Sequence, residues 1–323
     1  MDWTVVPGFS RIGYEVRRRS WEPQPSVLEG RDVLVTGASS GLGEAAAELL
    51  AGAGARVHMV VRNLEKGEDV RAAISERTGG GLRVWRCDVS DLDSVGELAR
   101  SFTAEVGELA ALVHNAGAMP PKRERSAQGI ELTLATNVIG PFLLTGLILS
   151  SLRSGVPSRI ISVSSGGMYT QGLNAEDLQL AGRDYDPSRF YAHSKRCEVI
   201  LSELWAERLA GSGISAHAMH PGWADTPGLQ ASMPGFRRVT KPLLRSARQG
   251  ADTIAWLAGD EQPGRSSGLF WQDRRPRPTH RTRSTKESEA DRERLWQECE
   301  RLSGWSIGAS ETSAANGGGR TAR

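Results

Sequence analysis

The chain has 323 residues, and its forty basic and thirty-eight acidic side chains leave a formal net charge of only +2. A charge this small gives no global field that would recruit nucleic acid or an anionic membrane. Hydrophobic residues make up 39% and charged residues 24%, which is typical of a soluble globular protein. The length of the chain allows a large core in one α/β domain or in two small ones. Its cysteines are few and far apart in sequence, which predicts no disulfide framework and no metal site, and indicates a reducing compartment: Cys87, Cys197 and Cys299.

Residues 1–30 predict an extended N-terminal arm, because three prolines discourage a long helix there: Pro7, Pro23 and Pro25. Its aromatic side chains could dock the arm on the domain or on a partner, and we favour the domain: Trp3, Phe9, Tyr14 and Trp21. The arm has no continuous apolar core, which argues against a secretory signal. The longest apolar run, residues 138–152, is shorter than the ~20 residues that a membrane span needs. We therefore expect a cytoplasmic protein without a membrane span.

Residues 32–46 combine a short apolar run, a glycine-rich turn and the start of a helix. Residues 33–35 are apolar like a buried parallel strand, Thr36 and Gly37 end the run, and residues 41–43 open an alanine-rich helix. This order brings backbone N–H groups and the positive end of a helix dipole to one point, where a phosphate can bind. The stretch therefore predicts a nucleotide site, and the alternative interpretation is an ordinary tight turn.

Strand and helix patterns alternate along the rest of the chain. Strands are predicted at residues 33–35, 55–61, 82–87, 109–114, 159–163, 214–219 and 268–271. Helices are predicted at residues 41–52, 65–77, 91–106, 126–153, 191–210 and 247–258. The alternation predicts one doubly wound α/β domain over residues 31–273, with a parallel sheet and its ligand beyond the carboxyl ends of the strands. Beyond it we expect a basic segment and helix over 274–305, and a disordered tail over 306–323.

Three groups of residues could carry chemistry. Tyr191 and Lys195 lie four apart on one face of a predicted helix, where an ammonium would favour the phenolate and tune the hydroxyl for proton transfer. Ser165 follows the fifth strand and could hydrogen-bond a reacting oxygen. Residues 115–117, Asn-Ala-Gly, end the fourth strand in a turn that a ribose or adenine could approach. The alternatives are a solvated helix face, a capped turn and a β-turn.

Together these motifs resemble the short-chain dehydrogenase/reductase family. Residues 36–43 resemble its TGxxxGxG cofactor loop, residues 115–117 its Asn-Ala-Gly motif, and Tyr191 with Lys195 its YxxxK pair. In addition, Asn137 resembles the catalytic asparagine, Ser165 the catalytic serine, and Pro221-Gly222 with Thr226 the loop beside the nicotinamide. The resemblance covers about residues 31–273 and implies a Rossmann-like fold. The chain also resembles a subgroup of this family whose substrates are poorly defined. That resemblance rests on residues 164–168, 220–228, 233–236, 249–253 and 270–274.

The resemblance also implies residue roles. Tyr191 would be the general acid in reduction and the general base in oxidation. Lys195 would favour its phenolate and hold the nicotinamide ribose, Ser165 would orient the substrate oxygen, and Asn137 would fix a water in a proton relay. The nicotinamide would supply the hydride.

The sequence departs from the family pattern at three places. His114 stands where many members have an asparagine, which could change the contacts near the adenine. The insert between Ser165 and Tyr191 is long, so Ser164 remains an alternative to Ser165. Glu44 replaces a basic residue of some phosphate-preferring members.

The residue after the second strand indicates the coenzyme. An NAD enzyme usually has an acid there, whereas Arg62 can pair with a 2′-phosphate, so we expect NADP (NADPH) and consider NAD less favoured. By resemblance, Asp88 would accept a bond from the adenine amino group. The predicted cofactor-binding residues are Gly37, Ser39, Ser40, Gly41, Leu42, Gly43, Arg62, Asp88, Val89, Asn115, Ala116, Gly117, Tyr191, Lys195, Pro221, Gly222, Trp223 and Thr226.

Residues 223–239 should fold over the substrate, and an apolar wall there would favour a hydrophobic carbonyl or alcohol: Trp223, Leu229, Met233 and Phe236, with Met168 and Tyr169. The alternative is a lid packed on its own domain or on a subunit. We expect an NADP-dependent oxidoreductase acting on a small molecule, and the alternative is a catalytically silent nucleotide sensor or scaffold. A nucleic-acid arm in the arginines after Asp273 lacks an interleaved aromatic surface, so we do not expect one. The family resemblance implies a homodimer or homotetramer, formed through the helices predicted from residues 126 and 191 unless the C-terminal extension blocks them.

Overall fold

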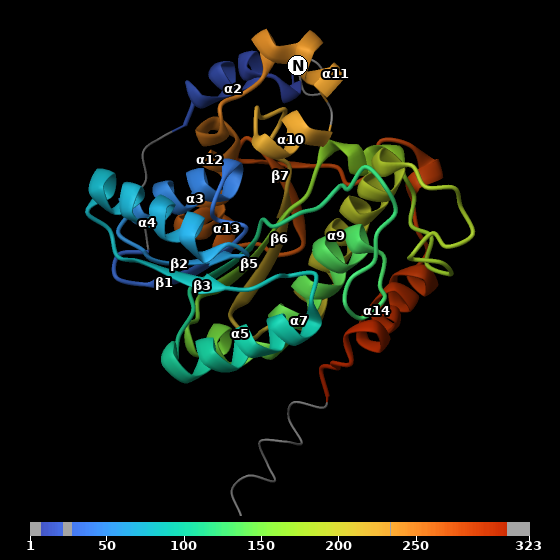
Figure 1. Cartoon of the computed structure of the whole chain (residues 1–323), viewed down its shortest axis with the longest axis horizontal. Helices are drawn as coiled ribbons and strands as arrows, with labels where there is room; N and C mark the ends of the chain where they lie inside the picture. Colours follow the sequence, from blue (N-terminus) through green and yellow to red (C-terminus); the bar gives the residue numbers. More distant parts are fainter. Residues whose placement is uncertain (1–7, 22–27, 233, 309–323) are drawn as a thin grey trace, which may run out of the picture.

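The computed structural model describes residues 8–21, 28–232 and 234–308. A sheet of eight strands crosses the domain in the order β3-β2-β1-β4-β5-β6-β7-β8 (Figure 1). Neighbours from β3 to β7 pair in parallel, and β8 pairs antiparallel with β7. The strands are β1 Asp32–Thr36, β2 Arg56–Val61, β3 Leu82–Arg86, β4 Ala111–His114, β5 Ser158–Val163, β6 Ile214–Met219, β7 Leu269–Gln272 and β8 Arg275–Arg277.

Helices cover both faces of this sheet, as a doubly wound fold requires. One face carries α3 Gly41–Gly52, α4 Leu64–Thr78 and α12 Ala247–Gly259, which enclose one apolar cluster with the central strands. The other face carries α5 Leu92–Glu105, α7 Gly140–Leu147 and α9 Pro187–Arg208, which enclose the larger cluster (Figure 1). The predicted doubly wound α/β fold is confirmed. Among the described residues, no helix combines the length and apolarity needed to cross a bilayer.

The last strand differs from the expected all-parallel sheet. After β7, Asp273 and Arg274 have φ angles of 52° and 56°. These left-handed conformations reverse the chain, so the first residues of the basic segment return along β7 as β8. The sequence of β8, Arg-Pro-Arg, fits the tendency of edge strands to carry charges and proline.

The single long helix predicted over 126–153 is wrong. The described chain turns at Gly129, and helical structure begins only with α6 Leu132–Leu134, which Glu131 caps by accepting bonds from the amides of Thr133 and Leu134. A π-helical turn, η1 Ala135–Ile139, follows, and α8 Leu149–Ser154 is separate from α7. Pro141 explains part of the distortion, because it has no N–H to donate to the carbonyl of Asn137 four residues earlier.

The expected extended arm is also wrong for the part that the structure describes. Arg11–Arg18 form helix α2, and Pro7, Pro23, Pro25 and Trp3 lie outside the described residues. Phe9 lies 4.4 Å from the ring of His220 and 6.1 Å from that of Trp223, while Tyr14 packs on Trp21. The segment therefore lies on its own domain, above the carboxyl ends of the central strands (Figure 1).

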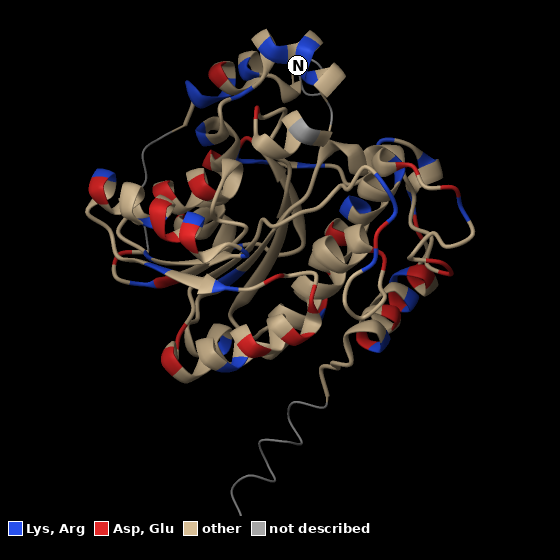
Figure 2. Ribbon diagram, in the orientation of Figure 1, with Lys and Arg blue, Asp and Glu red and all other residues tan. Residues whose placement is uncertain are grey.

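The helix of the C-terminal extension packs against α9. Helix α14 Glu289–Ser303 lies along α9, where Trp296 is 4.8 Å from Trp205 and Arg292 pairs with Glu203 and Glu207. Charges of both signs lie along α14 (Figure 2). The helix thus covers part of the face of α9 that could otherwise join subunits. Most of the tail predicted to be disordered, residues 309–323, lies outside the described residues.

Candidate active site

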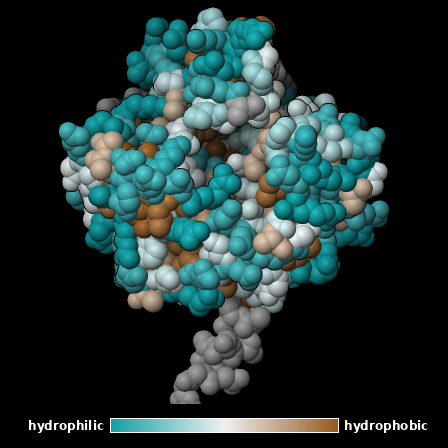
Figure 3. Space-filling model, viewed as in Figure 1, coloured by the Kyte–Doolittle hydropathy of each residue, from teal (hydrophilic) through white to brown (hydrophobic). Residues whose placement is uncertain are grey.

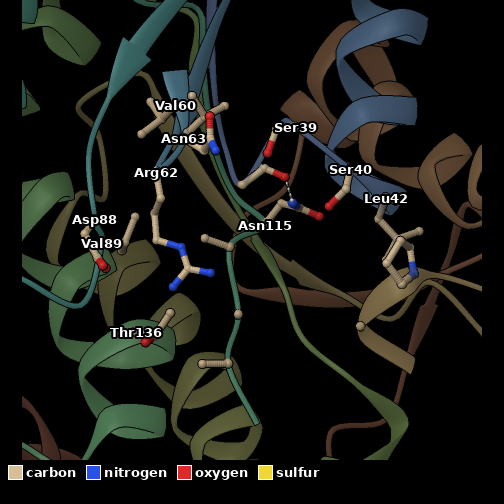
Figure 4. Close-up of a pocket in the computed structure, with 18 of the residues that line it drawn as sticks. Ser39, Ser40, Leu42, Val60, Arg62, Asn63, Asp88, Val89, Asn115 and Thr136 are labelled. Atoms are coloured by element: carbon tan, nitrogen blue, oxygen red, sulfur yellow. Dashed lines mark hydrogen bonds between the residues drawn. The ribbon is translucent and has the colours of Figure 1, made fainter. Parts of the chain in front are cut away.

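A cavity of about 600 Å³ opens at the carboxyl ends of β1, β2 and β4 (Figure 4). It is lined by Gly37, Ser39, Ser40, Gly41, Leu42, Val60, Val61, Arg62, Asn63, Lys66, Cys87, Asp88, Val89, Asn115, Ala116, Gly117, Ala118, Met119, Pro120, Leu132, Thr136, Thr226, Pro227 and Gly228. Most of the predicted cofactor residues lie on its wall. Those that do not line it are Gly43, Tyr191, Lys195, Pro221, Gly222 and Trp223.

The glycine turn forms one end of the cavity. Gly37 has a φ of 66°, and a side chain there would lie 2.9 Å from the backbone of Ala116. At Gly43 an added Cβ would lie only 2.3 Å from the carbonyl oxygen of Gly37 and 2.4 Å from Nδ2 of Asn115. Gly43 therefore lets α3 pack against the turn, while the first turn of α3, at Gly41 and Leu42, faces the cavity.

Asn115 and Thr36 fasten this turn to the end of β4. The side-chain amide of Asn115 donates to the carbonyls of Thr36 and Gly37 at 2.9 and 3.3 Å. The hydroxyl of Thr36 accepts from the amides of Asn115 and Ala116, both at 3.0 Å. The small residues Ala116 and Gly117 then continue along the wall. The Asn115–Gly117 turn therefore holds the glycine turn in place and also offers a surface that a flat ligand can approach.

Two cations lie at the end of β2. Arg62 is exposed and its guanidinium extends into the cavity between Asp88 and Asn115 (Figure 4). Lys66 also lines the cavity, one turn into α4, which Asn63 caps through its side chain. Sequence reasoning missed Lys66, although its position four residues after Arg62 was a usable signal. Across the cavity, Oδ1 of Asp88 accepts bonds from the amide and hydroxyl of Ser90.

Helix α9 carries the predicted tyrosine and lysine. The helix starts at Pro187, is capped by Asp186, and holds Tyr191 and Lys195 on one face, with Nζ of Lys195 5.3 Å from the Tyr191 ring centroid. Lys195 is buried and donates to the carbonyl of Val163 at 2.9 Å. Its ammonium is therefore held at the end of β5, beside the aromatic ring.

Gly117 connects the cavity to this pair. A Cβ added at Gly117 would lie 3.6 Å from Nζ of Lys195 and 3.5 Å from Oδ1 of Asn137. Oδ1 of Asn137 accepts from the amide of Ala118 at 2.8 Å, and its Nδ2 donates to the hydroxyl of Ser194 at 2.8 Å. The end of the cavity opposite the glycine turn thus lies next to Asn137 and Lys195.

The two serines after β5 have different surroundings. Ser164 is buried and its hydroxyl donates to the carbonyl of Lys195 at 2.8 Å, which ties β5 to α9. Ser165 is only partly buried and accepts from the amide of Gly167 at 3.2 Å. Because an accepting hydroxyl keeps its proton for another partner, Ser165 is the serine that can donate to a ligand.

The segment over the cavity brings part of the predicted apolar wall together. Thr226, Pro227 and Gly228 line the cavity at the start of helix α10 Pro227–Ser232. Trp223 packs 5.1 Å from Phe236 of the next helix, α11 Pro234–Thr240. The surface is hollowed between this region and the body of the domain (Figure 3).

Other members of the predicted wall lie elsewhere. Met168 is fully buried in a core cluster with Val199, Ala218 and Phe270, so its inclusion in a substrate wall is wrong. Tyr169 donates to the carbonyl of Pro278. Met233 lies outside the described residues.

Sequence reasoning also missed Glu198, one turn after Lys195. Its Oε1 lies 2.6 Å from Nζ of Lys195, and the carboxyl group is buried. A single acid within an amphipathic helix gives no signal in the sequence that separates a buried ion pair from a solvated face.

Comparison with known proteins agrees with this geometry. The sequence model of the family described as short chain dehydrogenase matches residues 31–235. Dehydrogenase/reductase SDR family member 12 of Homo sapiens is 38% identical over 299 residues, covering 91% of this chain and 93% of that protein. Retinol dehydrogenase 12 of Homo sapiens is 35% identical over 280 residues, covering 85% and 87%.

A solved structure shares the fold. A protein described as a short chain dehydrogenase from Escherichia coli CFT073, complexed with NADPH, has a TM-score of 0.64 at 24% identity and covers 78% of this chain and 100% of its own. The family match over most of the domain, and the two relatives that align along nearly the whole chain, support the same assignment. The chain belongs to the short-chain dehydrogenase/reductase family.

Proposed function

We propose that the protein transfers a hydride between NADP(H) and a small carbonyl or alcohol substrate, with Tyr191 as the acid and base. One observation carries the proposal: Gly117 joins a dinucleotide-sized cavity to the buried ammonium of Lys195, which lies 5.3 Å from the Tyr191 ring centroid. Backbone N–H groups and a helix N-terminus at one end fit a pyrophosphate. Proton-transfer groups at the other end fit a redox reaction at a C–O bond.

The cofactor would be held by the glycine turn, by the Asn115–Gly117 turn and by Thr226. When bound, the nicotinamide supplies or accepts the hydride. In reduction the hydroxyl of Tyr191 gives its proton to the substrate oxygen, and in oxidation it takes one back. Lys195 favours the phenolate by its charge, Ser165 donates to the same oxygen, and Asn137 holds the backbone of Ala118 beside them.

Arg62 and Lys66 support NADP(H) over NAD(H). Both are cations on the cavity wall at the end of β2, where an NAD enzyme would place an acid that binds the ribose hydroxyls. A guanidinium and an ammonium can together bind the 2′-phosphate by charge-assisted hydrogen bonds.

A hydrophobic substrate is supported by the aromatic pair Trp223 and Phe236, which flank residues 226–228 of the cavity wall in sequence. A relative named for retinol, an apolar alcohol, points the same way. The alternative of a silent nucleotide sensor lacks support, because a sensor does not need Asn137, Ser165, Tyr191 and Lys195 together.

The test is an NADPH-oxidation assay with a panel of apolar aldehydes and ketones, on the wild type and on Tyr191→Phe. Removal of the hydroxyl should lower kcat by about 10²-fold or more, because proton transfer from a placed side chain contributes that much. NADPH affinity should stay within about threefold, since the ring remains. Tyr14→Phe, which changes a buried tyrosine of α2, is the matched control and should keep full activity. Equal turnover by wild type and Tyr191→Phe would refute the proposal.

A further inference from the structure

Glu198 forms a buried ion pair with the lysine of the proposed site. It lies one turn after Lys195 on α9, and its Oε1 is 2.6 Å from Nζ of Lys195. Side-chain exposure is 8% for Glu198 and 3% for Lys195. A buried pair of this kind is costly to form, because both charges lose their hydration. Its presence beside the proton-transfer group calls for a functional explanation.

A second, much smaller cavity is lined by Glu198 but not by Lys195. Its volume of about 20 Å³ is enough for one water molecule. Glu198, His114, Thr145, Ser162 and Asn137 contribute its polar lining. Within the described parts of the chain, Oε2 of Glu198 and Nδ1 of His114 have no hydrogen-bond partner, although both atoms are buried. Two unpaired polar atoms on one small cavity indicate that a proton or a water is shared between them.

The hydrogen bonds around His114 determine which of its nitrogens carries the proton. The hydroxyl of Thr145 donates to the carbonyl of Pro141 at 2.9 Å, so it must accept from Nε2 of His114, 2.7 Å away. Burial lowers the pKa of His114 to about 3, so the ring is neutral at pH 7. Nδ1 is then a bare acceptor that faces the cavity. The carboxylic acid form of Glu198 supplies the matching donor, directly or through a water.

The electrostatics agree with a carboxyl group that exchanges its proton near neutral pH. Burial raises the pKa of Glu198 to about 7, against the opposing charge of Lys195. Burial also disfavours the charge of Lys195, but Glu198 and Tyr191 outweigh it and raise the pKa of the lysine. The titratable groups that face the carboxyl are Lys195 on its own helix and His114 on β4. The other neighbours on β5 and α7 are the hydroxyls of Ser162 and Thr145.

We propose that Glu198 is a proton-relay residue that acts through Lys195, linking Tyr191 to the small cavity behind the site. This inference rests on the proposed function. In reduction the O–H bond of Tyr191 breaks and its proton goes to the substrate oxygen. The phenolate recovers a proton from the ammonium of Lys195, and the lysine amine recovers one from the carboxylic acid of Glu198. The resulting carboxylate is reprotonated by water through the cavity, and oxidation runs the same transfers backwards.

The test compares pH profiles of NADPH-dependent reduction for the wild type, Glu198→Gln and Glu203→Gln. Glutamine keeps an oxygen for Lys195 but carries no transferable proton. We expect the wild-type kcat to fall as pH rises through about 7, where Glu198 loses its proton. The kcat of Glu198→Gln should be at least about tenfold lower at pH 7 and should not show this fall with rising pH, while the affinity for NADPH stays unchanged. Glu203→Gln, a carboxyl of the same helix that pairs with Arg292 instead, should keep the wild-type profile.

The outcomes separate the relay from the proposed function. If the wild type is active and the kcat of Glu198→Gln stays within about twofold of the wild-type kcat at every pH, the relay is overturned but the proposed function is not. A wild type without NADPH turnover, or a fully active Tyr191→Phe, overturns the proposed function itself. If Glu198→Gln does not fold, the wild type still decides: a kcat that is flat between about pH 6 and pH 8 overturns the relay.

Discussion

At the scale of single residues, the choice of coenzyme depends on the two cations at the end of β2. Arg62 extends into the cavity and Lys66 lines the same wall (Figure 4). Neither has a buried partner that would hold it away from a ligand, as far as the described residues show. A 2′-phosphate would gain hydrogen bonds from both, whereas a ribose hydroxyl would gain little from either.

We therefore expect Arg62→Ala to weaken NADPH binding by about 10- to 100-fold, the value of one hydrogen bond between charged groups. NADH binding should change by less than about twofold. Fluorescence titration with both coenzymes measures this. The control is Arg71→Ala, which removes a partly exposed arginine of helix α4 that pairs with Glu68 and does not line the cavity. Equal losses for NADPH and NADH would contradict the role of Arg62.

At the scale of elements, the N-terminal segment is held to the domain by a buried charge network. Asp273 accepts from Arg17 at 2.7 Å and from Arg245 at 2.6 and 2.9 Å, and Arg245 also donates to the carbonyls of Gly8 and Ser10. Side-chain exposure is 1% for both Asp273 and Arg245. One carboxylate thus joins α2, the turn before β8 and the loop before α12.

Asp273→Asn should reduce the free energy of unfolding by about 3–5 kcal/mol, because it removes the buried negative charge that pairs with the guanidinium groups of Arg17 and Arg245. Urea unfolding measures the loss, and limited proteolysis should then cut within residues 8–21. The matched control is Asp252→Asn, whose partly exposed pair with Arg274 should contribute about 1 kcal/mol or less. A loss for Asp273→Asn no larger than that of the control would show that the network does not hold the segment.

The elements also show how far a sequence can be interpreted. The buried strands followed from short apolar runs between turns, because such runs have few other structures available. Their order in the sheet needed the structure. The prediction of one helix over 126–153 failed because the residues that interrupt it act locally, while the apolar pattern continues through them. Gly129 turns the chain and Pro141 disturbs the helix. The C-terminal helix was predicted, but not the face it covers, since that depends on contacts between Trp296 and Trp205 from distant parts of the chain.

The same contrast holds for the candidate site: residues in local motifs were predicted, and residues that reach the site through packing were not. Motif residues such as Gly37, Asn115 and Lys195 lie where strand ends meet, which parallel topology alone predicts. Glu198 needed the structure, because only packing brings its carboxyl group to a cavity, whereas the spacing of Lys66 from Arg62 was a signal that the sequence already held. Met168 had the right chemistry for a substrate wall but lies in the core.

At the scale of the whole molecule, buried histidines make the free energy of unfolding depend on pH. Four of them accept a hydrogen bond from an N–H group, which a protonated ring nitrogen cannot do: His58 from Trp85, His193 from Asn174, His217 from Trp271 and His220 from Gly166. Burial lowers the pKa of His193 to about 4, and burial with the charge of Arg245 lowers that of His220 to about 3. In the unfolded chain a histidine has a pKa of about 6.5.

Because the folded state binds fewer of these protons, their contribution is fully present above about pH 6.5 and is lost as pH falls towards about 4. The free energy of unfolding should therefore fall over that window. His193→Gln keeps an acceptor for Asn174 without a titrating ring, so it should reduce the slope by about 1.4 kcal/mol per pH unit. Urea unfolding at a series of pH values measures both slopes. An unchanged slope for His193→Gln would show that this ring does not stay neutral in the folded protein.

The central claim is that a nicotinamide dinucleotide binds across the carboxyl ends of the strands, from the glycine turn to Tyr191. Calorimetric titration of the purified protein with NADPH, and separately with NADH, tests it most directly. We expect a saturable heat at one coenzyme per chain, with NADPH bound more tightly than NADH. Absence of heat with both coenzymes, in folded protein, would contradict it.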